Sequence, residues 1–281
     1  MWSVKSPSFE SGATFDLCAD RINSAVLRAK MKGIRQEIVD LSTEYDAYAK
    51  LGKLYLVETH KKGIGAVGGA DLIKNYTGRM VGKKMPARAI YDALKILPRN
   101  DRCPFCRYGT IETLDHVLPK ESYPGLSVAP KNLVGSCNRC NKGKHAAAPT
   151  GPKDCAVHPY FDEIDDQRWL IAEIVETTPA AALFSVGITP GFHANLRARV
   201  LHQFDALDLA HLYSNVATEE IAGIAEELEE VFQAGGFADV AAHLDRKCRS
   251  RHKSGCNSWQ AALYEAMASS SWYCKGGFRT S

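Results

Sequence analysis

Two cysteine pairs with the spacing C-x-x-C limit what this chain can fold into. Cys103 and Cys106 form the first pair, Cys137 and Cys140 form the second, and 30 residues lie between the pairs. Each pair places two sulfurs on one side of a tight loop, so together they supply the four thiolates of a tetrahedral structural Zn²⁺ site. A redox C-x-x-C motif would instead be a single pair beside a βαβ pattern. Because so short a segment lacks a core of its own, we expect zinc to stabilise it.

The residues framed by these cysteines indicate a reaction centre. Asp115 and His116 end a predicted strand before the turn at Pro119, and neighbouring strand residues point to opposite faces. Asn141 directly follows Cys140, so the zinc site would fix its position. Asp115 and Asn141 offer two hard oxygen ligands, which suits a Mg²⁺ ion that keeps several waters. A purely structural role for His116 remains the alternative.

The same residues carry a family resemblance. The pattern D-H-x-x-P, then N-L-V, then C-x-x-C-N-x-x-K resembles the zinc-bearing branch of the HNH, or ββα-metal, endonucleases. The resemblance covers about 45 residues. It implies that His116 is the general base that activates water, and that Asp115 and Asn141 hold one catalytic Mg²⁺ or Mn²⁺. Asn132 would correspond to the asparagine of the H-N-H pattern and brace the loop between two strands. The alternative is that Pro130-Lys131-Asn132 simply forms a turn.

The chain departs from the family pattern at the last residue of the H-N-H motif. That position is often histidine in the family, and here it is Asn141. An amide oxygen still binds metal, so we expect activity with a preference for Mg²⁺ and Mn²⁺ over softer ions.

The charge distribution favours a polyanionic partner for the first half of the chain. Residues 1–100 have a net charge of +7, residues 101–150 of +3, and residues 151–281 of −7. A basic region around the reaction centre suits DNA, whose backbone is contacted without reading sequence. The alternative is a solvated helix face. We predict nucleic-acid contacts from seven basic residues, namely Lys83, Lys84, Arg88, Lys120, Arg139, Lys142 and Lys144.

Periodicity and turn signals divide the chain into three expected regions. These are a helical, basic region over 1–98, an HNH core with its zinc site over 99–150, and a β-hairpin with helices over 151–281. A helical pattern runs over 16–51 with a break at Gly33. Thr218 predicts a helix start, and Gly235-Gly236 predicts a stop. The expected fold class is α+β, with mainly helical regions on both sides of the ββα-metal core.

The use of cysteine and the hydropathy of the chain indicate the cellular compartment of the protein. The other five cysteines are scattered and are interpreted as ordinary thiols, namely Cys18, Cys155, Cys248, Cys256 and Cys274. This usage fits a reducing cytoplasm better than a disulfide scaffold. The first 15 residues lack the apolar segment of a secretory signal, and no apolar run predicts a membrane helix.

These observations lead to an expected function. We expect metal-dependent cleavage of DNA by the nuclease effector of a bacterial anti-phage defence system. The analogy with Septu-type systems implies an ATPase or other defence subunit as partner. Two alternatives remain open: a stand-alone sequence-specific restriction endonuclease, and a non-catalytic zinc module that binds nucleic acid or protein. The sequence does not show the oligomeric state.

Overall fold

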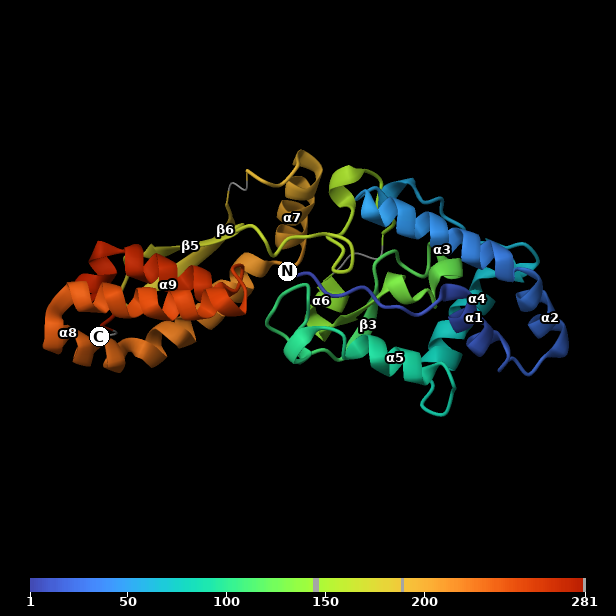
Figure 1. Cartoon of the computed structure of the whole chain (residues 1–281), viewed down its shortest axis with the longest axis horizontal. Helices are drawn as coiled ribbons and strands as arrows, with labels where there is room; N and C mark the ends of the chain where they lie inside the picture. Colours follow the sequence, from blue (N-terminus) through green and yellow to red (C-terminus); the bar gives the residue numbers. More distant parts are fainter. Residues whose placement is uncertain (144–146, 188–189, 280–281) are drawn as a thin grey trace. The chain divides into compact units, whose positions relative to one another are not determined.

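A computed structural model describes residues 1–143, 147–187 and 190–279 (Figure 1). The chain divides into two compact units, Met1–Glu163 and Ile164–Ser281. Both boundaries expected from the sequence, after residues 98 and 150, lie inside the first unit. Mixed helices and small two-stranded sheets make up the described residues.

The first unit begins with three helices in the predicted helical stretch. They are α1 (Ser11–Ala19), α2 (Ala25–Gly33) and α3 (Arg35–Lys50). The break at Gly33 is confirmed, since α2 ends there. Ser24 caps α2 by accepting a hydrogen bond from the backbone N–H of Leu27. These helices bury one apolar face each, and that face forms the core with α4 (Gly69–Lys74) and α5 (Arg88–Lys95).

Two glycine positions explain how the segment before α4 turns. The strands β1 (Gly63–Ile64) and β2 (Val67–Gly68) form a minimal antiparallel hairpin. Gly63 has φ +126° and Gly65 has φ +50°, conformations that L side chains rarely adopt. This glycine-rich stretch is therefore a tight turn.

The centre of the first unit is a two-stranded antiparallel sheet followed by a helix. Strand β3 (Thr113–His116) pairs with β4 (Leu133–Ser136), and α6 (Asn138–Gly143) follows and packs against β3. Helix α5 packs against both strands. At Gly135 a Cβ atom would lie 3.3 Å from the carbonyl oxygen of Lys95, so the small residue permits the close approach of α5.

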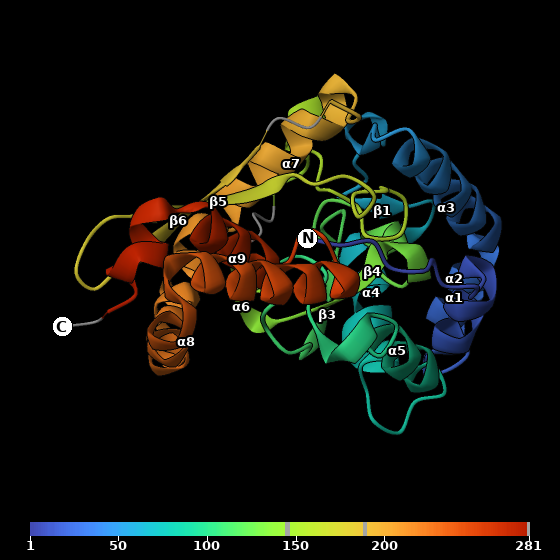
Figure 2. The ribbon, with the colours of Figure 1, turned by 60° about the vertical axis from the view of Figure 1, so that its left-hand side comes forward.

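The second unit packs helices against a separate hairpin. Strands β5 (Leu170–Val175) and β6 (Ala181–Val186) pair as the sequence predicted. They pack against α7 (Ala194–Ala206), α8 (Leu209–Ser254) and α9 (Trp259–Ser269), and Figure 2 shows α8 and α9 side by side. Despite the length of α8, no helix in the described residues is both long and apolar enough to cross a membrane.

One predicted helix boundary is wrong and one is confirmed. Thr218 does not start a helix, because α8 already begins at Leu209 and Thr218 lies in its interior. The adjacent Ala217 and nearby Ile221 continue one buried stripe, so packing overrides the local start signal. The stop at Gly236 is confirmed as an interruption of α8, with φ +74° and ψ −165°.

Candidate functional site

The four predicted zinc ligands come together. The sulfurs of Cys103, Cys106, Cys137 and Cys140 all lie within 4.8 Å of one another, and all four residues are buried. The sulfurs of Cys106 and Cys137 are 3.8 Å apart. A tetrahedral Zn²⁺ with Zn–S bonds of about 2.3 Å requires a similar sulfur spacing. The cluster therefore has the donor set and size of a structural zinc site.

The loop of the first cysteine pair is shaped for this cluster. Arg107 adopts a left-handed conformation with φ +55°, and the backbone N–H of Gly109 donates to the Cys106 sulfur at 3.3 Å. A Cβ atom on Gly109 would lie 2.8 Å from the Cys137 sulfur, so only glycine fits there. The backbone N–H of Trp2 donates to the Pro104 carbonyl at 2.9 Å, which ties the N-terminal segment to the loop.

Burial opposes ionisation of these cysteines without a cation. Burial raises the pKa of the Cys103 thiol, whereas hydrogen bonds from the neighbouring thiols lower the pKa of Cys106. Four thiolates cannot share so small a buried volume unless a positive ion neutralises them. A divalent ion removes this conflict, because it binds the deprotonated form of each sulfur.

His116 ends β3 and is held by groups that the sequence did not suggest. Its Nε2 lies 2.9 Å from the carbonyl oxygen of Ser127, and the Ser127 hydroxyl donates to the carbonyl of Leu72 at 3.0 Å. The ring of Tyr76 meets the imidazole edge-on, with a centroid distance of 4.4 Å. Because a carbonyl only accepts, neutral His116 carries its proton on Nε2 and its lone pair on Nδ1.

Asp115 precedes His116 on β3 and pairs in register with Val134. Its side chain is largely buried. Burial is the largest cause that raises the pKa values of Tyr45 and Tyr76. The negative charge of Asp115 is one of the smaller causes. The Asp115 carboxylate is therefore close enough to both phenols to affect their ionisation.

Asn132 is fully buried and braces the loop that joins β3 to β4. Its side-chain oxygen accepts from the Leu118 backbone N–H at 2.7 Å. Its amide nitrogen donates to the carbonyls of Leu118 at 3.0 Å and Leu126 at 3.1 Å. The side chain therefore fixes Leu118 and Leu126 rather than the His116 backbone itself. This geometry describes a positioning residue.

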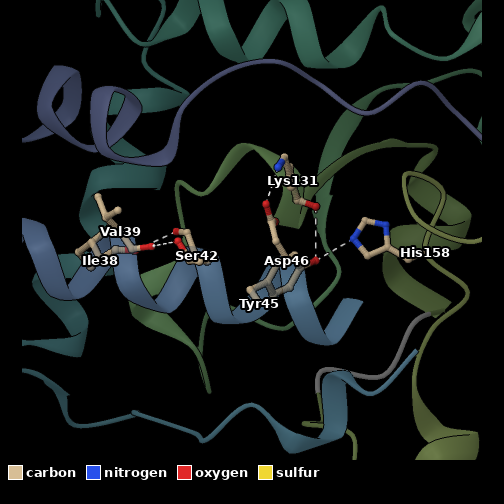
Figure 3. Close-up of polar contacts among 8 residues, drawn as sticks. Ile38, Val39, Ser42, Tyr45, Asp46, Lys131 and His158 are labelled. Carbon is tan, nitrogen blue, oxygen red and sulfur yellow. Dashed lines mark hydrogen bonds and ion pairs between the residues drawn. The ribbon is translucent and has the colours of Figure 1, made fainter. Parts of the chain in front are cut away.

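A second brace holds the residues on either side of Asn132, and Figure 3 shows the part of it formed by Tyr45, Lys131 and His158. The hydroxyl of Tyr45 lies 2.8 Å from Nε2 of His158 and donates to the Lys131 carbonyl at 3.4 Å. The side chain of Lys131 forms an ion pair with Asp46. The hydroxyl of Tyr160 donates to the Leu133 carbonyl at 2.8 Å. Helix α3 and the segment around residue 158 thus fix the start of β4.

His158 and Tyr160, near the end of the first unit, lie in its interior. His158 is fully buried, and Tyr160 is 8 % exposed. The backbone N–H of Tyr160 donates to Nδ1 of His158 at 3.2 Å, which leaves the ring proton on Nε2, facing Tyr45. Both aromatic rings therefore support the sheet from the interior.

The remaining predicted residues differ in burial. Asn141 lies on α6, half-buried, and α6 packs against the strand that carries Asp115. Four of the predicted basic residues are exposed, namely Lys83, Lys84, Arg139 and Lys142.

Two other basic side chains already bind neighbours, and one lies outside the described structure. The Arg88 guanidinium pairs with Asp92 and donates to the Val81 carbonyl, and Lys120 pairs with Glu121 at 2.7 Å. Lys144 lies outside the described residues.

Sequence reasoning missed Tyr45, Tyr76 and Ser127. Tyr45 and Tyr76 are distant in sequence from the residues they contact, and a tyrosine on an apolar helix face carries no local signal of a site. Ser127 contributes its backbone carbonyl to His116, a group that every residue type possesses.

Comparison with known proteins gives two partial similarities. The chain is 32% identical to protein ea31 of Escherichia phage lambda over 181 residues, which cover 63% of this chain and 59% of that protein. It is 36% identical to Septu protein PtuB of Bacillus thuringiensis over 70 residues, which cover 22% of this chain and 26% of that protein. The chain thus spans about three fifths of one relative and a quarter of the other. No family model and no solved structure matches it.

Proposed function

We propose that the first unit is a metal-dependent HNH-type endonuclease that hydrolyses phosphodiester bonds in DNA. The observation that carries the proposal is the order β3, β4, α6 around a four-cysteine cluster, with Asp115 and His116 at the end of β3. The antiparallel strand pair followed by a helix supports the ββα-metal core that the sequence resemblance implies. Asn132 braces the connecting loop at the position that the same resemblance predicts.

His116 is the proposed general base. Since Nε2–H donates to the Ser127 carbonyl, Nδ1 of the neutral ring is the atom that accepts a proton from the attacking water. The Tyr76 ring and the Ser127 carbonyl fix the plane of the imidazole, which holds Nδ1 in one direction. The resulting hydroxide attacks phosphorus in line with the 3′ oxygen, the P–O3′ bond breaks, and the departing oxygen takes a proton from water. The resemblance implies 5′-phosphate and 3′-hydroxyl products.

Asp115 and Asn141 are the proposed holders of one Mg²⁺ or Mn²⁺. A carboxylate and an amide oxygen form a hard donor set, which fits these ions. Packing of α6 against β3 brings the helix of Asn141 to the strand of Asp115. When bound, the ion supplies Lewis-acid stabilisation of the scissile phosphate and the leaving oxygen.

The biological setting follows from the partial similarity to Septu protein PtuB. We place the chain as a nuclease component of anti-phage defence that works with another subunit, an ATPase in our proposal. The similarity to protein ea31 does not discriminate between functions.

The direct test is cleavage of plasmid and single-stranded DNA by the purified chain with Mg²⁺, Mn²⁺ or EDTA. We expect metal-dependent cleavage that His116→Ala reduces by about 100-fold or more, in the range of a lost general base. His211→Ala, which alters an exposed histidine on α8, is the control and should cleave normally. Cleavage at one defined site would favour a restriction endonuclease. Equal activity of His116→Ala and the wild type, or no cleavage with either metal, would overturn the proposal.

A further inference from the structure

A second group of metal-ligand side chains lies in the second unit. Cys248, His252 and Glu265 each offer one ligand atom, and these atoms lie within 4.8 Å of one another. Cys248 and His252 are four residues apart on α8, so they share one helix face. Glu265 projects from α9, which packs along α8. The sequence predicted only ordinary thiols here, because the glutamate comes from another helix.

We propose that Cys248, His252 and Glu265 bind a second Zn²⁺ ion, separate from the Cys103–Cys140 cluster. Thiolate, imidazole and carboxylate are the three side-chain ligand types of zinc in proteins, and a thiolate with an imidazole selects zinc over Mg²⁺ or Ca²⁺. The thiolate and the carboxylate supply two negative charges towards the divalent ion. This site does not depend on the proposed nuclease function.

The positively charged guanidinium of Arg168 competes with a metal ion for the Glu265 carboxylate. This guanidinium forms an ion pair with Glu265 through both carboxylate oxygens. A carboxylate offers about four lone-pair positions, so a guanidinium and a metal ion can share it. Carboxylates that bind metals usually accept a hydrogen bond from an outer partner, and that partner orients them. Arg168 would therefore act as the outer hydrogen-bond donor that orients the Glu265 carboxylate.

The protonation of His252 and Cys248 is compatible with zinc binding. Burial and the charge of Arg168 lower the pKa of His252, which keeps the imidazole neutral and able to bind. Burial raises the pKa of the Cys248 thiol, so the thiolate forms only as the ion displaces its proton. The thiol of Cys256 donates to the Asp165 carbonyl at 2.9 Å, so we do not include Cys256 in the proposed ligand set.

The site would join two helices at a basic segment. The last turns of α8 carry Arg246, Lys247, Arg249, Arg251 and Lys253 around the two α8 ligands. Gly255, with φ +146°, ends the helix directly afterwards. A zinc ion held between α8 and α9 would fix this positively charged end of α8 against the rest of the unit.

The test is the zinc content of the purified full-length chain, measured by inductively coupled plasma mass spectrometry after dialysis. We expect two zinc ions per chain in the wild type and one in either His252→Ala or Cys106→Ser. His252 is only partly buried, so its replacement should leave the fold intact, which circular dichroism checks. His211→Ala, on the same helix, is the matched control and should keep two ions.

One zinc ion per chain in the wild type, or two in folded His252→Ala, would overturn the proposal. A wild-type content of one zinc ion overturns the proposal without any variant, and the loss of one ion in folded His252→Ala assigns the second ion to this site. Because the readout is metal content, the result is independent of whether the chain cleaves DNA.

Discussion

The hydroxyl of Tyr45 on α3 lies 2.8 Å from Nε2 of His158, 113 residues away in the sequence, and both side chains are buried. Since the same hydroxyl donates to the Lys131 carbonyl, the pair links α3 to the loop that precedes β4. Burial holds the pKa of Tyr45 well above its usual value, so the phenol remains protonated and can act as this donor.

Tyr45→Phe should destabilise the chain by about 1–3 kcal/mol, because it removes the buried hydroxyl that bonds to Nε2 of His158 and to the Lys131 carbonyl. The free energy of unfolding in urea measures this. Tyr48→Phe, at a half-buried tyrosine on the same helix, is the control and should change stability by less. Equal effects of the two substitutions would show that the link contributes nothing.

Asn132→Ala should cost about 3 kcal/mol, because three backbone groups of Leu118 and Leu126 lose their buried partner. We also expect a loss of DNA cleavage beyond the loss of folded protein, since the braced loop carries the Ser127 carbonyl that orients His116. Thermal denaturation and the cleavage rate of the folded fraction measure the two effects. Asn215→Ala, at an exposed position of α8, is the control, and a wild-type stability for Asn132→Ala would contradict the prediction.

Acidification should weaken the first unit through His60. Its Nε2 accepts from the Gly125 backbone N–H at 3.0 Å, and burial lowers its pKa below the ordinary value of about 6.5. The unfolded chain therefore binds a proton at a higher pH than the folded chain. The contribution of His60 is fully present above pH of about 6.5 and declines as pH falls towards its folded pKa.

Urea titrations at pH 7.5 and pH 5 measure this pH dependence. His60→Gln retains an acceptor for Gly125 and does not titrate, so its stability should depend less on pH over this window. His211→Ala should keep the wild-type slope. Parallel pH profiles for wild type and His60→Gln would mean that other groups cause the acid sensitivity.

Charge reversal at Lys83 and Lys84 should weaken DNA binding. Both side chains are exposed, just before α5, the helix that packs against β3 and β4. If both contact phosphates, Lys83→Glu with Lys84→Glu should lower the affinity and reduce the slope of log K against log salt by about 2. Fluorescence anisotropy at several salt concentrations, with His116→Ala to prevent cleavage, measures the slope.

The double substitution Lys30→Glu with Lys50→Glu makes the same charge change on exposed positions of α2 and α3. It should preserve the wild-type slope. If both double variants lower the slope equally, binding depends on net charge and not on the position of Lys83 and Lys84.

The zinc frame and the order of the central elements could be predicted because their signals are local. C-x-x-C spacing, the turn at Pro119 and the alternation in β3 involve residues within a few positions of one another, and zinc ligation then relates the two pairs. The β5–β6 hairpin was predictable for the same reason. In contrast, the start of α8 was misplaced because a buried stripe through Ala217 overrides the cap signal at Thr218.

The residue types available for chemistry follow from the order of amino acids alone: four thiolates, one imidazole beside a carboxylate, and amides at fixed spacing. Three relationships depend on how the chain folds: which ring nitrogen of His116 faces the Ser127 carbonyl, the bracing of one loop by Asn132 and Tyr45, and the position of Glu265 beside Cys248 and His252. The physical reason is that hydrogen bonds and ligand sets depend on distance in space. Side chains from separate helices reach such distances only when burial of apolar surface packs those helices together.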